Sequence, residues 1–366
     1  MSPEGSRRAD LLRELGGGSA VVDELLPLTG PLFSREPTVS WPPRDEAHVA
    51  DWRRYAEEAA SEGALPALQR RLIQLRFQVA AGISQTEEYR RATRRGELHD
   101  GRPPLLHFDD PAGLELHLLP TLGGSIPALV AGCRGDFETL VRVFSARNEP
   151  VPVPASMGAC LVRGLTNWDR LRAYRRAWEG ERSLTFPGAW ERELLRLQTA
   201  GEKHRYQDRF LILSRGPYSD VPAVEAGHGA EEWALASLRI REEHEGAHYL
   251  TLRAGAELRD APADELLADW LGLLRATGSY SASLAHRFLG LQGGGDYRAG
   301  GRLENYLGAG LTPAALRVLC RLLERVASVL ESLVAPREDG DLARLFLRLS
   351  AQSLEEIALS RPAGSR

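Results

Sequence analysis

The chain has 366 residues, of which 43% are hydrophobic and 26% are charged, and its formal net charge is −4 at pH 7. A chain of this length and composition can bury a sizeable core, which excludes disordered, collagen-like and disulfide-scaffold proteins. The near balance of 46 basic and 50 acidic residues lacks the basic excess typical of a nucleic-acid-binding protein. We therefore expect no nucleic-acid partner, and a ligand selected by a local site.

The sequence predicts a cytoplasmic protein without a membrane partner. Its N-terminus contains arginines but no apolar segment of a secretory signal, and the chain has no 18-residue uncharged apolar run. The three cysteines, Cys133, Cys160 and Cys320, are far apart and form no CxxC pair. Such sparse cysteines are typical of a reducing compartment and argue against a zinc site built on thiolates.

The first half of the chain mixes helical and strand patterns. Residues 1–44 are rich in Gly, Pro and Ser and are predicted to form an extended leader. Helical spacing of apolar residues then predicts helices over 45–62 and 64–81. Further along, strands are expected at 114–118, 126–130 and 209–214, and helices at 136–147, 166–178 and 189–199.

The remainder of the chain is predicted to be helical. Helices are expected over 231–254, 263–277, 312–336 and 341–359, several of them bounded by glycine or proline. The expected fold class is α+β and mostly helical, with a small mixed sheet that precedes the helix at 231–254. The expected organisation is a leader (1–44), an α/β N-terminal lobe (45–230) and a helical C-terminal lobe (231–366).

A group of potential metal ligands lies within the helix predicted over 231–254. His244 and His248 are four residues apart, so both imidazoles leave the same helical face about one turn apart and can converge on one metal ion. Glu245 lies beside that face, where it can reach a water molecule on the metal without binding the metal itself. This is the HExxH arrangement of zinc hydrolases.

A second pair of acidic residues lies on the next predicted helix. Glu265 and Asp269 are again four apart, and Glu265 follows His248 by 265 − 248 = 17 residues. The link contains a glycine and a proline and is long enough for the two helices to pack antiparallel. Glu265 can then complete a His2Glu zinc site with water in the fourth position, and Asp269 can accept the free N–H of a ligating histidine.

Together, HEGAH and the later DELLADWLG resemble the gluzincin, thermolysin-like metallopeptidases over about residues 231–275. The resemblance implies that His244, His248 and Glu265 hold Zn²⁺. It further implies that Glu245 is the general base and that Asp269 orients a ligating histidine.

The resemblance also implies a zincin-like fold, in which a sheet-bearing lobe is followed by a central helix and a helical C-terminal lobe. The order of the elements predicted here is similar. The wider chain, including SMGACLVRGLTNWDRL at 156–171 and RFLILSRGPYSDVPA at 209–223, resembles an uncharacterised bacterial family of about this length. The exopeptidase signature GxMEN is absent.

These observations predict a zinc-dependent hydrolase that cleaves a peptide or amide bond in a peptide or small amide substrate. Zinc would activate a water molecule, Glu245 would take its proton, and a further donor would stabilise the oxyanion. The candidate donors are Tyr249, Tyr280, His286, Tyr297 and Tyr306. Tyr280 and His286 are preferred because they follow the Glu265 helix and can fold back over the site.

Two other functions stay open at this level. Glu245 to His248 is also an ExxH motif, as in di-iron carboxylate proteins, but the second ExxH, Glu225 to His228, is flanked by glycines that indicate a loop. The chain can also be a non-catalytic scaffold that keeps a metal for stability. In the plainest interpretation, the histidines lie on a charged helix surface and the acidic residues occupy a helix's first turns, where the macrodipole favours them.

Three shorter clusters are predicted to be structural. Residues 167–170 (NWDR) read as a capped helix start, although a role in a pocket is open. Residues 107–110 (HFDD) read as a capped turn, with a metal-binding turn as the alternative. Residues 301–306 (GRLENY) read as a surface salt bridge, with the lining of a cleft as the alternative.

Overall fold

The computed structural model describes residues 3–97, 104–180, 188–256, 261–307 and 310–360. Over these residues the chain is α+β and mainly helical, as predicted. It divides into two compact units. Unit 1 comprises Met1–Pro43, Thr121–Gly124 and Gly216–Arg366, and unit 2 comprises Arg44–Pro120 and Ser125–Arg215.

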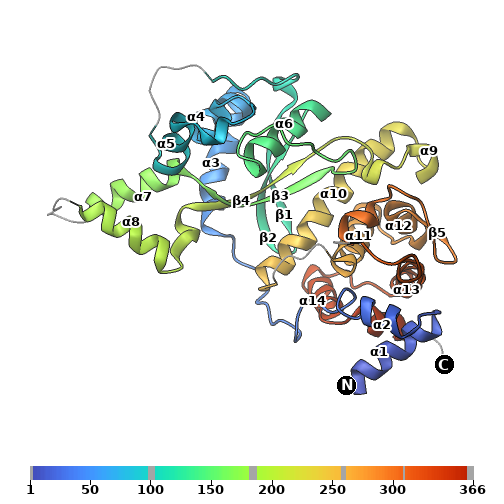
Figure 1. Cartoon of the computed structure of the whole chain (residues 1–366). Coiled ribbons are helices and arrows are strands. Elements are labelled where there is room, and N and C mark those ends of the chain that lie inside the picture. Colours follow the sequence, from blue (N-terminus) through green and yellow to red (C-terminus); the bar gives the residue numbers. More distant parts are fainter. Residues whose placement is uncertain (1–2, 98–103, 181–187, 257–260, 308–309, 361–366) are drawn as a thin grey trace. The chain divides into compact units, whose positions relative to one another are not determined.

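Unit 2 is built on a small mixed sheet in the order β1-β2-β4-β3 (Figure 1). The strands are β1 (Glu115–Thr121), β2 (Gly124–Val130), β3 (Ala159–Thr166) and β4 (Gln207–Leu213). Strands β2 and β4 are parallel, with Ala128 opposite Leu211. Strands β3 and β4 are antiparallel, with Cys160 opposite Ile212. The mixed sheet expected from the strand patterns is thus present, and it precedes the long helix α10 in the chain.

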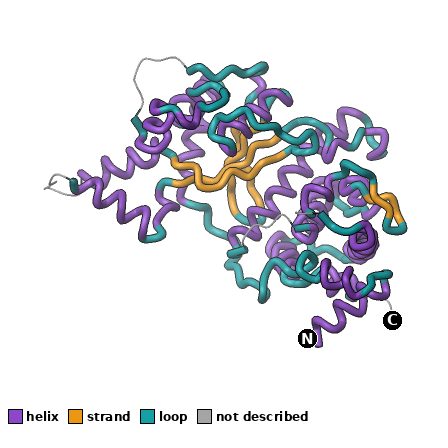
Figure 2. Tube along the Cα trace, viewed as in Figure 1, coloured by secondary structure: helices purple, strands orange, loops and turns teal. Residues whose placement is uncertain are grey.

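The core around the sheet is one of several apolar clusters to which the helices of unit 2 belong. Figure 2 distinguishes these helices from the strands. The helices are α3 (Ala47–Glu62), α4 (Ala64–Arg71), α5 (Glu87–Arg95), α6 (Arg134–Ser145), α7 (Trp168–Gly180) and α8 (Ala189–Thr199). Trp52 of α3, Phe137 of α6 and Phe210 of β4 are all fully buried in this core. Their aromatic rings supply the largest apolar surfaces that the sheet buries.

The helix predicted over 64–81 is wrong beyond Arg71. The chain turns extended at Leu72, with φ −106° and ψ 104°, and continues as a 3-10 turn over Ile73–Arg76. Leu72 and Leu75 are nevertheless buried. Burial of apolar side chains does not require a continuous helix. The spacing of the apolar residues therefore predicted correctly which side chains are buried, but it predicted the wrong backbone conformation after Arg71.

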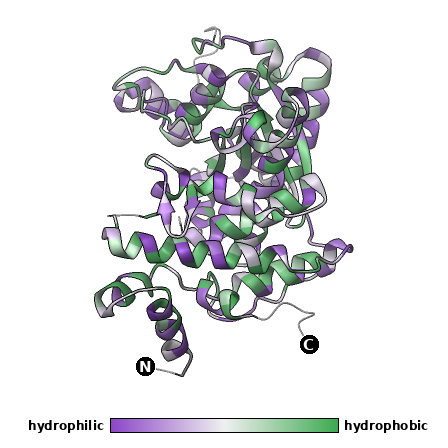
Figure 3. Cartoon of the chain, turned by 90° about the vertical axis from the view of Figure 1, so that its right-hand side faces the viewer, coloured by the Kyte–Doolittle hydropathy of each residue, from purple (hydrophilic) through white to green (hydrophobic). Residues whose placement is uncertain are grey.

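Unit 1 is almost entirely helical. Its helices are α1 (Pro3–Glu14), α2 (Ser19–Leu25), α9 (Ala223–Ala226), α10 (Ala230–Arg253), α11 (Pro262–Thr277), α12 (Ala282–Leu289), α13 (Pro313–Glu331), α14 (Asp339–Ser350) and α15 (Leu354–Leu359). A two-stranded hairpin, β5 (Leu291–Gly293) and β6 (Asp296–Tyr297), lies between α12 and α13. Hydrophobic and hydrophilic residues alternate along the helices (Figure 3), as expected for elements with one buried face.

The extended leader predicted over residues 1–44 is wrong for much of its length, because α1 and α2 occupy Pro3–Glu14 and Ser19–Leu25. Leu12 and Leu25 are fully buried in the core of unit 1. Arg8 pairs with the buried Glu355 of α15 at 3.1 Å. The glycines and prolines that suggested an extended chain lie mostly outside these helices, and the apolar pairs within them drive helix formation against the core.

The last predicted helix, 341–359, is two helices in the structure. Helix α14 ends at Ser350, and Ser353 starts α15 with a capping box in which its hydroxyl accepts the N–H of Glu356. A serine followed three residues later by glutamate is a helix start signal, which the continuous helical pattern obscured. None of the described helices combines the length and apolar character that spanning a bilayer requires.

Candidate metal centre

Helix α10 carries the two histidines on its most buried stretch. The helix has 24 residues, starts with Glu231 and Glu232 in its first turn, and is buried from Glu243 to Thr251. His244 and His248 are 5% and 8% exposed. Their rings lie nearly perpendicular, with centroids 4.7 Å apart. The four-residue spacing therefore places both imidazoles on one face that points into the protein rather than to solvent.

Helix α11 brings a carboxylate to the same face. Pro262 occupies its first turn together with Asp264 and Glu265, where the positive end of the helix dipole favours carboxylates. The helices α10 and α11 approach closely at Gly272, where a Cβ would lie 3.0 Å from the carbonyl oxygen of Ile240. This close packing holds the start of α11 against the histidines.

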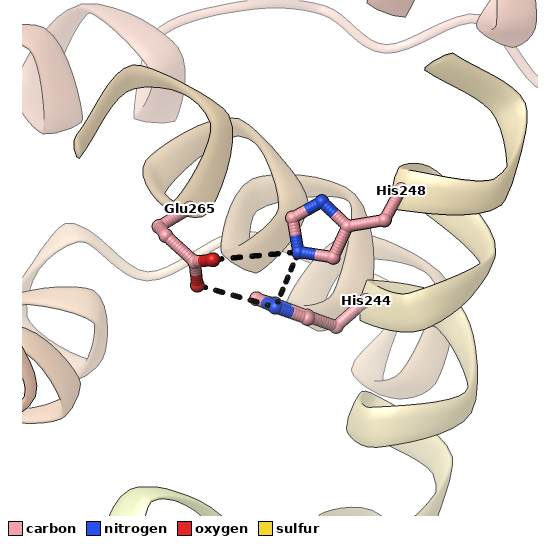
Figure 4. Close-up of side chains that lie close together, drawn as sticks. All are labelled: His244, His248 and Glu265. Atoms are coloured by element: carbon pink, nitrogen blue, oxygen red, sulfur yellow. Dashed lines mark hydrogen bonds and ion pairs between the residues drawn. The ribbon is translucent and has the colours of Figure 1, made fainter. Parts of the chain in front are cut away.

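Three potential ligand atoms converge in the structure (Figure 4). The Nε2 atoms of His244 and His248 are 3.1 Å apart. The Glu265 carboxylate lies 3.4 Å from Nε2 of His244 and 3.6 Å from Nε2 of His248. Ligands at about 2.1 Å from a tetrahedral zinc ion would be about 3.4 Å from one another. The observed separations span that value, so the donor set matches a zinc ion in both kind and spacing.

A second carboxylate lies behind each histidine. Oδ1 of Asp269 is 3.0 Å from Nδ1 of His244, and Oδ2 of Asp264 is 3.2 Å from Nδ1 of His248. Carboxylates in this position orient a histidine so that Nε2 faces a metal. The sequence predicted this role for Asp269 but not for Asp264. Its only signal was its place next to Glu265 in the first turn of α11.

Tyr218 and Arg302 surround Asp269, and neither contact was predicted from the sequence. The Tyr218 hydroxyl donates to Oδ1 of Asp269 at 2.6 Å and lies 2.8 Å from Nδ1 of His244. Arg302 pairs with Oδ2 of Asp269 and donates to the Tyr218 hydroxyl at 3.0 Å. Because Arg302 is only 8% exposed, the surface salt bridge expected for residues 301–306 is wrong.

The buried carboxylates favour positive charge on the histidines. Burial alone lowers the pKa of His248, but Asp264, Glu265 and Glu245 outweigh it and raise the pKa to about 10. Burial likewise opposes protonation of His244, yet hydrogen bonds with Asp269 and Glu265 raise its pKa. The pKa of Glu265 is lowered although burial opposes this, because both histidines and Arg302 attract its charge. The site thus has an electrostatic preference for cations.

Glu245 is buried beside the convergent ligands and is 9% exposed. Burial raises the pKa of its carboxyl group, against the attraction of His248 and His244. Glu245 thus lies on the same buried stretch of α10 as the two histidines.

The structure does not bring the two preferred oxyanion donors to the ligands. Among the described residues, the Tyr280 hydroxyl and Nε2 of His286 are buried without a hydrogen-bond partner. His286 lies against α13, where it interacts with Glu324, and Tyr280 lines a separate cavity of about 460 Å³ beside Trp270. Both residues follow α11 in the chain, and no described hydrogen bond or ion pair joins either of them to His244, His248 or Glu265.

Another of the candidate donors lies nearer. Tyr306 hydrogen-bonds to the Glu265 carboxylate, and burial raises the pKa of the Tyr306 hydroxyl. By contrast, Tyr249 receives a hydrogen bond from Arg253 and Tyr297 donates to the carbonyl of Gly301. Tyr306 is therefore the candidate that directly contacts a potential ligand.

A second group of potential ligands in the described residues, in unit 2, has a structural role. It comprises Asp109, Cys133 and Asp136. The two carboxylate oxygens of Asp136 accept the backbone N–H groups of Asp109 and Asp110 at 2.7 and 2.9 Å. The side chain of Asp109 is exposed. Asp136 thus closes the HFDD turn, in agreement with the capped turn expected there.

The chain belongs to a family of unknown function, DUF7005, whose model matches residues 10–361. The match includes α10, α11, Tyr218 and Arg302. No curated protein matches the chain. No solved structure matches it.

Proposed function

We propose that this protein is a zinc-dependent hydrolase with a gluzincin-like site that cleaves a peptide or amide bond. The observation that carries the proposal is the convergence of His244, His248 and Glu265 with a carboxylate behind each imidazole. Two imidazoles and one carboxylate are the protein ligands of many catalytic zinc sites, which leave the fourth position open. The zincin-like fold is part of the same proposal.

His244, His248 and Glu265 would hold the zinc ion. Zinc in such a site acidifies a water molecule and polarises a carbonyl group. Asp269 accepts the Nδ1–H group of His244, and the Asp264 carboxylate lies beside Nδ1 of His248, so both favour orientations in which Nε2 is directed at the metal position.

Glu245 is proposed as the general base. It is adjacent in sequence to His244 and is buried on the same stretch of α10 as both histidines. It can accept the proton that the attacking water loses and deliver it to the leaving nitrogen. Neither step needs Glu245 to bind the metal.

Tyr306 is the residue that the geometry favours as the donor to the developing oxyanion. Its hydroxyl hydrogen-bonds to Glu265. The carbonyl oxygen of a substrate bound next to the Glu265 carboxylate would therefore be within hydrogen-bonding distance of the Tyr306 hydroxyl. A hydroxyl held in a buried site stabilises negative charge more strongly than one in water. Tyr306 replaces Tyr280 and His286 in this role.

A di-iron centre has less support from the described residues. His228 of the second ExxH motif lies 3.2 Å from Glu232 and stacks on Trp233. It is outside the group formed by His244, His248 and Glu265. The three converging residues would hold a single ion, which supports the hydrolase proposal over a di-iron centre.

Metal analysis of the purified protein tests the proposal. We expect one zinc ion per chain, lost in His248→Ala but kept in His228→Ala, which removes a histidine outside the group. Glu245→Gln should retain zinc and abolish cleavage of a quenched fluorescent peptide library.

The matched control for the base is Glu242→Gln on the same helix, which should keep both zinc and activity. Absence of stoichiometric zinc uptake by the native chain would contradict the metal site. Two iron atoms per chain would favour the di-iron alternative. Zinc binding without cleavage in the native chain would favour the non-catalytic scaffold.

A further inference from the structure

We infer that Arg302 and Tyr218 form a clamp that positions His244 for metal binding, acting through Asp269. The inference deepens the proposed zinc site and rests on it. Neither residue touches the three ligand atoms in a described hydrogen bond, and neither comes from α10 or α11. They are positioning residues: they determine how firmly one of the ligands is held.

Asp269 is the residue through which the clamp acts. Its side chain is fully buried on α11, and its carboxylate receives three donors. Oδ1 faces Nδ1 of His244 at 3.0 Å and the Tyr218 hydroxyl at 2.6 Å, while Oδ2 pairs with Arg302. A buried carboxylate with a single neutral partner would be costly to keep ionised. Arg302 offsets that cost, so Asp269 can remain a strong acceptor for His244.

The planar guanidinium of Arg302 can donate to Asp269 and to the Tyr218 hydroxyl at the same time. One of its terminal nitrogens pairs with Asp269, and the other donates to the Tyr218 hydroxyl at 3.0 Å. The carbon of the same guanidinium lies 5.4 Å from the centre of the Tyr218 ring. A planar fork can bind two acceptors at fixed directions, whereas a lysine ammonium supplies a point charge without this geometry.

Tyr218 is itself held against α10. Arg241 of α10 donates to the carbonyl groups of Gly216 and Pro217 at 2.6 and 2.7 Å. The two residues after Tyr218, Ser219 and Asp220, have φ of 51° and 58°. Left-handed backbone at two successive residues with side chains is costly, and it persists where surrounding contacts impose it. The backbone at Tyr218 is therefore fixed relative to the helix that carries His244.

The clamp links three separate segments of unit 1 to one ligand. The turn at Tyr218–Asp220, helix α11 and the turn at Arg302–Tyr306 meet at Asp269. Loss of either clamp residue should leave His244 in place on α10 but free its ring to turn. Such supporting groups around a metal typically contribute 10- to 100-fold to metal affinity.

Zinc titration of the full-length protein measures this contribution. We expect Arg302→Gln and Arg302→Lys to weaken Zn²⁺ binding about 10- to 100-fold, and Tyr218→Phe to weaken it by a smaller factor. Tyr218→Phe keeps the ring that packs on Phe288, so it should fold normally. The double variant should lose less than the product of the single losses, because both residues act through Asp269.

Arg170→Gln is the matched control. Arg170 is another buried arginine, 6% exposed, and it pairs with Asp208 and Asp51 in unit 2. Its loss should lower the unfolding temperature but leave the zinc affinity of the folded protein unchanged. A zinc affinity in Arg302→Gln and Tyr218→Phe within twofold of the native value would overturn the clamp.

A second measurement needs no metal. In the metal-free native protein, the Nδ1–H proton of His244 should exchange slowly in NMR spectra of histidine-labelled chain, and this signal should be lost in Arg302→Gln and Tyr218→Phe. If the native chain binds no zinc, the proposed function fails, while this signal still decides whether the clamp exists. Unchanged exchange in both variants would reject it.

Discussion

At the scale of single residues, the site uses both ring nitrogens of each histidine. Nε2 faces the ligand position, and Nδ1 faces Asp269 or Asp264. Among the described contacts, the guanidinium of Arg302 pairs with Asp269. When both imidazoles are neutral, as metal binding requires, the buried carboxylates outnumber the buried cation Arg302. A divalent cation at the ligand position would reduce that costly imbalance.

Asp264 provides a test of this arrangement at His248. With a metal on Nε2, Nδ1 carries a proton that the Asp264 carboxylate accepts, and a neutral asparagine accepts it less strongly. We expect Asp264→Asn to lower Zn²⁺ affinity about 10- to 100-fold, measured by competition with a chelating dye. Asp339→Asn is the control, since Asp339 is an exposed partner of Arg275. Equal affinities in the two variants would show that Asp264 does not support His248.

At the scale of elements, the sequence predicted those parts of the site whose signal is local. His244 and His248, and likewise Glu265 and Asp269, are separated by one helical turn, so helical periodicity alone places each pair on one face. The existence of α10, α11 and α13 was confirmed for the same reason.

The parts of the site that the sequence did not predict come from distant turns. Arg302 is 33 residues beyond Asp269, and Tyr218 is 26 residues before His244. No periodic pattern connects a residue in a turn with its partner on a helix, because the contact depends on how the chain packs. For the same reason the hydrogen bond between Tyr306 and Glu265 could not be predicted from sequence.

The contact between α10 and α11 leads to a prediction about Gly272. A Cβ at this position would lie 3.0 Å from the carbonyl oxygen of Ile240 and 3.4 Å from His244. We expect Gly272→Val to separate the helices, to destabilise the protein by about 1–3 kcal/mol and to weaken zinc binding, with Gly272→Ala intermediate. Urea denaturation and zinc titration measure the two effects.

The control for this prediction is Gly18→Ala, because a Cβ added at Gly18 would meet no atom within 4 Å and the residue has an ordinary φ of −74°. The stability and zinc affinity of this variant should match those of the native protein. If Gly272→Val were as stable as the native chain, the two helices would not depend on close approach at this position.

At the scale of the whole molecule, the candidate metal centre belongs to one unit. His244, His248, Glu265 and the clamp residues Tyr218 and Arg302 all lie in unit 1. The sheet of unit 2 has its own apolar core and contributes no residue to this group. Binding of a ligand raises the free energy of local unfolding only for those segments whose unfolding disrupts the site.

Zinc should therefore protect unit 1 selectively from hydrogen exchange. At a free zinc concentration 100 times its Kd, binding stabilises the folded state by about 2.7 kcal/mol. Amide hydrogen exchange that requires unfolding of the metal site should therefore slow about 100-fold. Mass spectrometry should show this slowing in peptides from α10 and α11, and no change in peptides from β4 and α6. His248→Ala should abolish the protection without altering the exchange of unit 2. Equal protection of β4 and α11 would instead mean that the two units open as one, because zinc could then not stabilise one without the other.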